Sequence, residues 1–301
     1  MTVSSEHSFS YSAFENFFRG PRDQIKQKLF IYLPLVTSCT ALAIKPALDI
    51  GCGRGEWLEL LGDNYINAVG IDSNAEFVDY CQSMSLKVEM QDLFEFLAIQ
   101  GDQQYSLITG FHIIEHIPPD KQLGFLHSVF RLLSPGGIII FETPNPENVT
   151  VGSCNFYIDP THIRPIPTHL LQFLALQAGF ASPLIARLNR DTVGAPLQLM
   201  ADSEPGAAHY NQLVHMIASR MLQAPDYSLI AFKPPAPDKA MINAVAAINH
   251  LNDSFIQPPD SSDKSPSAKE YTDPLNTYTQ TVRHTYRQLI CALKQANNEI
   301  W

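Results

Sequence analysis

The stretch ALDIGCGRGE at residues 47–56 decides the fold, because it joins a short apolar run to a glycine-rich loop and the start of a helix. The run from Ala47 to Ile50 suits a buried strand. The glycines that follow let the backbone approach a ligand closely, since a glycine has no side chain to hold the ligand away. The first turn of the next helix then offers amide groups to an anionic ligand group. The stretch therefore predicts a ligand site at the end of a first strand.

A carboxylate ends the next predicted strand, in the run VGID at residues 69–72. Asp72 in this position can accept hydrogen bonds from both hydroxyls of a ribose. Dinucleotide dehydrogenases combine the same parts, but their G-x-G-x-x-G pattern has a third glycine where this chain has Glu56. The spacing here is G-x-G-x-G, so the pattern departs from the dehydrogenase form.

A further carboxylate, Asp92, follows the third predicted strand and precedes Leu93. A carboxylate and an adjacent backbone amide can hydrogen-bond the exocyclic amine and a ring nitrogen of adenine. The alternative is that Asp92 is the N-cap of a helix over residues 94–97. The two roles are compatible.

Outward from these motifs, short apolar runs alternate with amphipathic stretches as far as residue 142, which predicts an α/β, Rossmann-like, mostly parallel sheet with helices on both faces. The predicted organisation is an N-terminal helical cap at 1–45, a catalytic domain at 46–235, a helix and a Pro- and Ser-rich linker at 236–274, and a C-terminal helix at 275–301. The 4,3 spacing of the last helix fits either a short coiled coil, which makes contact with a second copy or a partner, or a helix packed on the domain.

Residues 46–148 resemble the core of the class I S-adenosylmethionine-dependent methyltransferases, and the resemblance extends over about 25–235. It rests on residues 49–55, Asp72, Asp92-Leu93, residues 111–118 and the run LSPGG at 133–137. The resemblance implies a seven-stranded sheet with the last strand antiparallel, and S-adenosylmethionine bound over the carboxyl ends of the strands.

The predicted cofactor site takes in the glycine loop, the ends of the strands and one arginine of the N-terminal cap. Arg19 is expected to reach the methionine carboxylate of the cofactor, and the alternative is a solvated surface arginine. The full set consists of Arg19, Asp49, Gly51, Cys52, Gly53, Asp72, Ser73, Asp92, Leu93 and Phe111.

The run GFHIIEHIP at residues 110–118 follows the fourth predicted strand, beside the methyl group in the family that the chain resembles. In a helical turn, His112, Glu115 and His116 share one face, since they are spaced at i, i+3 and i+4. Methyl transfer from a sulfonium is an in-line displacement. The protein must therefore align the acceptor and, for a hydroxyl, remove its proton or lower its pKa. A histidine suits the first of these tasks and a divalent cation the second.

The predicted catalytic set is His112, Glu115, His116 and His162. Together with the run TPNPEN at 143–148, it is similar to metal-dependent small-RNA 2′-O-methyltransferases, in which two acidic residues and two histidines hold Mg²⁺ or Mn²⁺ against vicinal hydroxyls. Glu115, His116 and His162 match that metal site, and His112 occupies the remaining acidic position. Three histidines and one carboxylate favour Mn, Fe or Zn over Mg. Two alternatives stay open: His112 or His162 is a general base without a metal, or the Glu-His pair only packs and orients its loop.

The acceptor is predicted from chemistry and resemblance together. A net charge of −10 and the lack of a Lys/Arg cluster count against nucleic acid. The chain also resembles bacterial methyltransferases of surface-polysaccharide (O-antigen-type) assembly, through residues 14–20 and 155–162, which implies a sugar hydroxyl as acceptor. Phe156 and Tyr157 either stack on that sugar or anchor a loop. The alternatives are O-methylation of a small molecule such as a quinone or natural product, RNA 2′-O-methylation, or an inactive scaffold.

Cellular location is predicted from what the sequence lacks. The N-terminus has no secretory pattern, and no apolar run reaches the ~20 residues of a membrane span. The cysteines form no CxxC pair, so a disulfide framework or zinc ribbon is not expected. These features predict a cytoplasmic protein, at the inner face of the membrane if it works with glycan-assembly enzymes. The cysteines are Cys39, Cys52, Cys81, Cys154 and Cys291.

Overall fold

The stretch at residues 47–56 folds in the computed structural model as β1 (Ala47–Ile50), a glycine loop and the start of α4 (Glu56–Asp63). Every residue of β1 is buried. Gly55 caps α4 with a left-handed φ of 76°, and a Cβ atom on it would lie only 2.6 Å from Leu86 Cδ1. A side chain at this position would therefore both strain the backbone and clash.

The structure describes residues 10–39, 45–193, 197–235, 239–250 and 256–257. Contacts divide the chain into two units, Met1–Pro259 and Asp260–Trp301, and all the described residues belong to the first. The predicted C-terminal helix at 275–301 lies outside the described residues, as does the predicted linker at 257–274 apart from Gln257.

The described residues form strands, α-helices and short 3-10 turns. The strands are β1, β2 (Ala68–Asp72), β3 (Val88–Met90), β4 (Tyr105–Phe111), β5 (Leu133–Pro144), β6 (Ala181–Leu188), β7 (Leu197–Gln198), β8 (Asp226–Phe232) and β9 (Ile256–Gln257). The α-helices are α1 (Tyr11–Phe18), α2 (Arg22–Leu29), α3 (Leu33–Thr37), α4, α5 (Ala75–Ser83), α6 (Leu93–Ile99), α7 (Pro119–Leu132), α8 (Val149–Ser153), α9 (Thr168–Gln177), α10 (Ala207–Arg220) and α11 (Lys239–His250). The 3-10 turns are η1 (Phe30–Tyr32), η3 (Ile114–His116), η4 (Asn155–Ile158) and η5 (Arg190–Val193).

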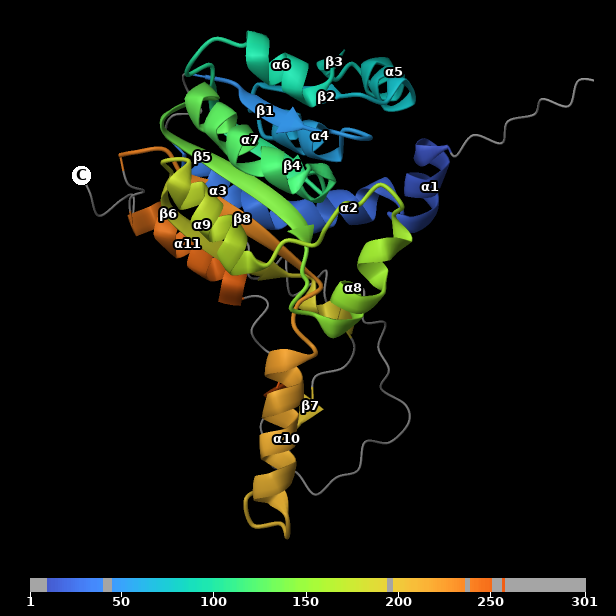
Figure 1. Ribbon diagram of the computed structural model, residues 1–301, viewed down its shortest axis with the longest axis vertical. Helices are drawn as coiled ribbons and strands as arrows, with labels where there is room; N and C mark the ends of the chain where they lie inside the picture. Colours follow the sequence, from blue (N-terminus) through green and yellow to red (C-terminus); the bar gives the residue numbers. More distant parts are fainter. Residues whose placement is uncertain (1–9, 40–44, 194–196, 236–238, 251–255, 258–301) are drawn as a thin grey trace, which may run out of the picture. The chain divides into compact units, whose positions relative to one another are not determined.

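The main sheet has seven strands in the order β3-β2-β1-β4-β5-β8-β6 (Figure 1). The pairs among β1 to β5 are parallel, whereas β8 runs antiparallel to both β5 and β6. The predicted α/β fold with an antiparallel last strand is confirmed. β7 and β9 form a separate two-stranded sheet.

Two apolar layers cover the sheet, because successive side chains of a strand point to opposite faces. On β5, Ile139 and Phe141 belong to the core that contains α6, α7 and α9. Their neighbours Ile138 and Ile140 belong to the core that contains α2, α3, α4 and α11. The sheet is therefore covered on both faces, and ligand sites are left to its edge at the strand ends.

Polar contacts tie the N-terminal helices to the glycine loop and α4. Arg54 is 8% exposed; its guanidinium donates to Asn16 Oδ1 (3.1 Å) and to the carbonyl of Gly20 (3.0 Å). Arg22 pairs with Glu59 at 2.6 Å. These contacts place α1 beside the carboxyl ends of the strands. None of the helices in the described part of the chain combines the length and apolar character that a bilayer crossing requires.

Candidate active site

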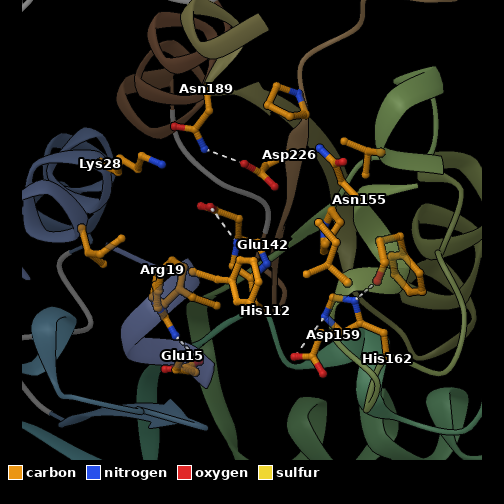
Figure 2. Close-up of a pocket in the computed structure, with 18 of the residues that line it drawn as sticks. Glu15, Arg19, Lys28, His112, Glu142, Asn155, Asp159, His162, Asn189 and Asp226 are labelled. Atoms are coloured by element: carbon orange, nitrogen blue, oxygen red, sulfur yellow. Dashed lines mark hydrogen bonds and ion pairs between the residues drawn. The ribbon is translucent and has the colours of Figure 1, made fainter. Parts of the chain in front are cut away.

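Two cavities meet at the carboxyl ends of the parallel strands. The first, the glycine-loop cavity, has a volume of about 440 Å³ and contains Gly51, Gly53 and Asp72 in its wall. The second, the Glu142 cavity, has a volume of about 380 Å³ and contains Glu142 and His162 (Figure 2). The residues common to both walls are Tyr11, Glu15, Arg19, Phe111, His112 and His116.

The glycine loop and Asp72 form one end of a preorganised site. Asp72 Oδ2 accepts from the Gly53 amide and Oδ1 from the Asn74 amide, both at 2.8 Å. Gly51 has a φ of 64°, and a Cβ atom on it would lie 2.6 Å from Ile113 Cδ1. The carboxylate is thus fixed at the mouth of the loop, and Ser73 lines the cavity beside it.

Asp92 is the N-cap of α6. Its Oδ1 accepts from the amides of Phe94 (2.9 Å) and Glu95 (3.0 Å). Asp92 and Leu93 also line the glycine-loop cavity. Capping and the predicted place beside a ligand therefore coexist in one residue.

Two of the predicted cofactor residues, Asp49 and Cys52, have side chains behind the cavity wall rather than in it. Asp49 lies opposite Thr109 in the sheet, and its Oδ1 accepts a hydrogen bond from the Thr109 hydroxyl at 2.7 Å. Burial raises the pKa of Asp49 to about 7, against the hydrogen bond from Thr109. Cys52 turns toward the side-chain-free Gly70 and joins the core of Leu58, Val78, Cys81 and Val88. Both side chains support the loop from behind, and the prediction that these residues bind the cofactor stays a prediction.

Arg19 lines both cavities, so it is not a freely solvated surface arginine. Its Nη1 donates to Glu15 Oε1 at 2.9 Å within α1. Contact with Glu15 raises the pKa of Arg19 despite burial, which works in the opposite direction. Arg19 therefore presents a fixed positive charge to the glycine-loop cavity.

The segment after β4 differs from the predicted helical turn. His112 has a left-handed φ of 58°, and only Ile114–His116 form a turn, which is a 3-10 turn. His112 consequently lies between two carboxylates, one of which belongs to the Glu-His pair. Its Nδ1 is 3.4 Å from Glu115 Oε1 and its Nε2 is 3.7 Å from Glu142 Oε1.

This placement decides the charge of His112. Burial favours the neutral ring, but the contacts with Glu115 and Glu142 outweigh it and raise the pKa of His112 to about 10. The same contact holds the pKa of Glu115 below its usual value although burial pushes it up. A protonated imidazole cannot accept a proton, so this raised pKa counts against His112 as general base, and that alternative stays a prediction.

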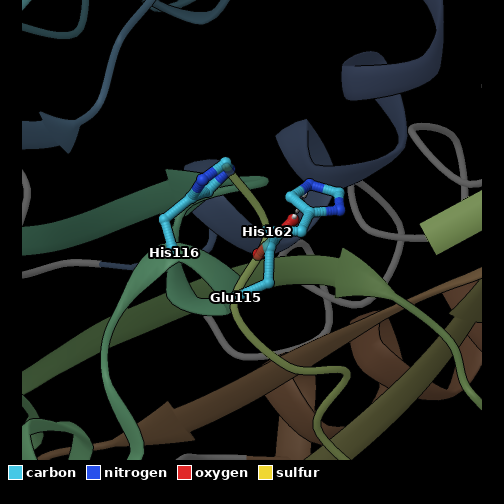
Figure 3. Close-up of side chains that lie close together, drawn as sticks. All are labelled: Glu115, His116 and His162. Carbon is cyan, nitrogen blue, oxygen red and sulfur yellow. Dashed lines mark ion pairs between the residues drawn. The ribbon is translucent and has the colours of Figure 1, made fainter. Parts of the chain in front are cut away.

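Glu115, His116 and His162 converge (Figure 3), with one ligand atom from each within 4.8 Å of the others. His162 Nδ1 lies 2.6 Å from the Phe156 carbonyl, and His116 Nδ1 lies 3.2 Å from the Thr161 carbonyl. A carbonyl only accepts, so each Nδ1 is the donor, and the tautomer with this proton on Nδ1 has its lone pair on Nε2. Burial lowers the pKa of His162, which favours this neutral form.

Glu115 is fully buried, and one of its two carboxylate oxygens accepts a hydrogen bond from a side chain. Thr143 donates to Oε2 at 2.9 Å. Among the described residues, no group donates a well-aligned hydrogen bond to Oε1, although His112 Nδ1 lies 3.4 Å and His162 Nε2 lies 3.7 Å from it. A buried carboxylate oxygen in this state is costly unless a cation or proton donor reaches it.

The sequence prediction missed Glu142, Asn189 and Asp226, which line the Glu142 cavity. Asn189 donates a hydrogen bond to Asp226 Oδ2 at 2.8 Å. Tyr32, which lies behind the wall, donates a hydrogen bond from its hydroxyl to Glu142. Asp226 begins β8, and the amino end of an antiparallel strand meets the carboxyl ends of its parallel neighbours. That rule could have found Asp226 once the last strand was expected to be antiparallel.

The aromatic pair at 156–157 divides between the two predicted roles. Phe156 is 1% exposed, its ring centroid is 4.5 Å from that of His162, and it is an anchor in the wall. Tyr157 is 61% exposed. Of the two, Phe156 is the one that lines the Glu142 cavity.

A family model, curated relatives and solved structures that are similar to this chain are all described as methyltransferases. Residues 37–182 match the family model described as a methyltransferase domain. The ubiquinone biosynthesis O-methyltransferase of Klebsiella pneumoniae is 30% identical over 106 residues, 34% of this chain and 43% of that protein. A probable S-adenosylmethionine-dependent methyltransferase of Mycolicibacterium smegmatis is 27% identical over 152 residues, 50% of this chain and 56% of that protein. The chain thus spans about half the length of the curated relatives it matches.

Among solved structures, a S-adenosylmethionine-dependent methyltransferase from Archaeoglobus fulgidus superposes with a TM-score of 0.67 and 29% identity. The match covers 75% of this chain and 100% of that chain. The descriptions of these relatives name no glycan, so the predicted glycan acceptor stays a prediction.

Proposed function

We propose that the protein, whose residues 37–182 match a family model of methyltransferase domains, is an S-adenosylmethionine-dependent methyltransferase that methylates a sugar hydroxyl of a bacterial glycan with the help of a divalent cation. The observation that carries the proposal is the convergence of Glu115, His116 and His162. His116 lines both cavities, and His162 lines the Glu142 cavity. The proposal includes a cytoplasmic location next to glycan assembly.

The glycine-loop cavity is the proposed cofactor site. S-adenosylmethionine supplies a methyl group already activated on a sulfonium, so the chain has only to align donor and acceptor. Asp72 is held ready for the ribose, and Asp92 with Leu93 for the adenine. Since His112 and His116 line both cavities, the methyl group is delivered where the cavities meet.

The residues fit a cation. Glu115 offers a buried oxygen without a well-aligned donor, and each histidine offers Nε2 while its Nδ1 is held by a backbone carbonyl. A histidine whose second nitrogen donates to a carbonyl is the usual arrangement of a metal ligand. Two histidines and one carboxylate suit Mn²⁺ or Fe²⁺ better than Mg²⁺. When bound, the cation lowers the pKa of a hydroxyl that it contacts.

The lining of the Glu142 cavity supports a neutral, polyhydroxylated acceptor. Glu142, Asp159 and Asp226 can accept hydrogen bonds from hydroxyls, and Asn155 and Asn189 can both donate and accept. These carboxylates repel phosphates, which counts against RNA. Phe14 and Phe18 of α1 add aromatic surface at the same cavity.

A second candidate is the phenolic hydroxyl of a small aromatic molecule. The similarity to ubiquinone biosynthesis O-methyltransferases supports it, over 106 residues of this chain. A phenol is more acidic than a sugar hydroxyl, so this reaction depends less on a cation.

The test is an acceptor screen with radiolabelled S-adenosylmethionine on oligosaccharides, catechols and RNA, with metal-free and Mn²⁺-loaded enzyme. The proposal expects label on an oligosaccharide, and activity that EDTA abolishes and Mn²⁺ restores. Methylation of a catechol alone would establish the second candidate. Full activity of metal-free enzyme would remove the cation from the proposal, and failure to bind S-adenosylhomocysteine would indicate an inactive scaffold.

A further inference from the structure

Glu15 and Arg19 lie one helical turn apart on α1, and we propose that they bind the two opposite charges of the cofactor's amino-acid end. Arg19 takes the carboxylate, as the sequence predicts, and Glu15 takes the ammonium group. The inference rests on the proposed use of S-adenosylmethionine, and it makes Glu15 a cofactor-binding residue.

Glu15 has one oxygen in use and one to spare. Its Oε1 accepts from Arg19 at 2.9 Å. Its Oε2 is buried, and within the described part of the chain no group donates a hydrogen bond to it. The Glu15 side chain as a whole is only 13% exposed. Leaving a buried carboxylate oxygen without a donor is costly, so a ligand that brings a proton donor is favoured there.

Both side chains face the glycine loop. Arg19 Nη1 and Glu15 Oε2 lie 3.6 and 3.8 Å from the position that a Cβ atom on Gly53 would occupy. Figure 2 shows Arg19 and Glu15 joined to each other, and both residues line the two cavities. An ammonium and a carboxylate on one carbon atom match a carboxylate and a guanidinium held side by side.

The other carboxylates of the glycine-loop cavity are occupied or belong to its other end. Asp72 accepts a backbone amide on each oxygen. Asp92 caps α6, next to the expected adenine. Asp49 lies behind the wall, bonded to Thr109. Glu15 Oε2 is therefore the acceptor that the lining offers where the amino-acid end of the cofactor lies.

The experiment measures binding rather than turnover, by titration calorimetry of the full chain with two ligands. S-adenosylhomocysteine has the amino-acid end, and methylthioadenosine lacks it. The variants are Glu15→Gln, which keeps the shape and removes the charge, and Arg19→Gln. The control is Glu59→Gln, since Glu59 holds α2 through Arg22 and Lys26 but lines neither cavity.

We expect Glu15→Gln and Arg19→Gln each to weaken S-adenosylhomocysteine about tenfold, the value of one charge-assisted hydrogen bond, and to leave methylthioadenosine within twofold. Glu59→Gln leaves both ligands unchanged. Unchanged affinity of Glu15→Gln for S-adenosylhomocysteine would overturn the inference, as would an equal loss for both ligands, which indicates a merely structural role. A wild-type chain that binds neither ligand would instead overturn the proposed function.

Discussion

At the scale of single residues, Gly51 controls how closely a ligand approaches the first strand. Replacing it by alanine puts a Cβ atom 2.6 Å from Ile113 Cδ1 and holds a non-glycine residue at a φ of 64°. We expect Gly51→Ala to lower the free energy of unfolding by about 2 kcal/mol and to weaken S-adenosylhomocysteine more than tenfold. Urea unfolding and calorimetry measure the two effects.

The matched control for this substitution is Gly62→Ala in α4. No atom lies within 4 Å of the position that its Cβ would take, and the residue is helical. Stability should stay the same or rise by up to about 1 kcal/mol, because alanine is the better helix former. Equal losses in both variants would contradict the steric explanation.

Asp226 gives a prediction about the acceptor alone. It lines the Glu142 cavity but not the glycine-loop cavity, and Asn189 orients its carboxylate. Asp226→Asn should raise KM for the acceptor found by the screen about tenfold. Affinity for S-adenosylhomocysteine should change less than twofold. A variant that loses cofactor affinity and keeps its KM would show that the two cavities have been assigned the wrong way round.

Residue types near a strand end could be predicted from the sequence, but pairings across elements could not. Asp72 ends β2, and Asp92 and Leu93 come shortly after the end of β3 at Met90, so their place at the cavity is a local property. Glu15 and Asp226 reach the site from α1 and β8, and no local spacing connects them to it. The left-handed φ of His112 has no signal of its own in the sequence, and it replaces the helical turn predicted to begin at His112.

At the scale of elements, the docking of the N-terminal helices depends on Arg54. Its guanidinium reaches Asn16 and Gly20, and its Nε lies 2.8 Å from Glu56 Oε1, which is also buried. Arg54→Ala removes this close ion pair of Glu56, whose remaining ion pair is with Arg22 Nη1 at 3.9 Å. We expect a loss of about 3 kcal/mol in urea unfolding and faster hydrogen exchange in α1.

An exposed cation provides the comparison. Lys87 donates to Asn67 at 3.1 Å on the surface, and Lys87→Ala should change stability by less than about 0.5 kcal/mol. If Arg54→Ala is equally harmless, then the contacts of Arg54 do not hold α1 in place.

The elements themselves were predictable because their apolar periods are regular. The alternation of apolar runs and amphipathic stretches predicted as far as residue 142 corresponds to β1 to β5 and the helices between them. The run LSPGG at 133–137, on which the family resemblance partly rests, lies within β5, which begins at Leu133. Gly136 in this run has a left-handed φ of 74°, which marks a local irregularity of the strand.

At the scale of the whole molecule, both cavities and the main sheet are built from residues before 236. We expect a chain of residues 1–259 to fold and to bind S-adenosylhomocysteine with the affinity of the full chain within twofold. Circular dichroism and calorimetry on both lengths check this. A shortened chain that folds but binds more than tenfold more weakly would show that residues 260–301 contribute to the cofactor site.

The antiparallel strand β8 also sets an order of events on the ribosome. In the described sheet β6 pairs only with β8, which ends at Phe232, so β6 must wait, after leaving the exit tunnel, for chain made later. At synthesis rates of ~5–20 residues per second this wait is on the order of seconds, during which β5 has an open edge. The strands around the glycine loop, β1 to β4, pair with one another and with β5, and all five emerge before β6. The nascent chain can thus form the strands of the glycine-loop cavity first, and the Glu142 cavity is complete only when Asp226 arrives.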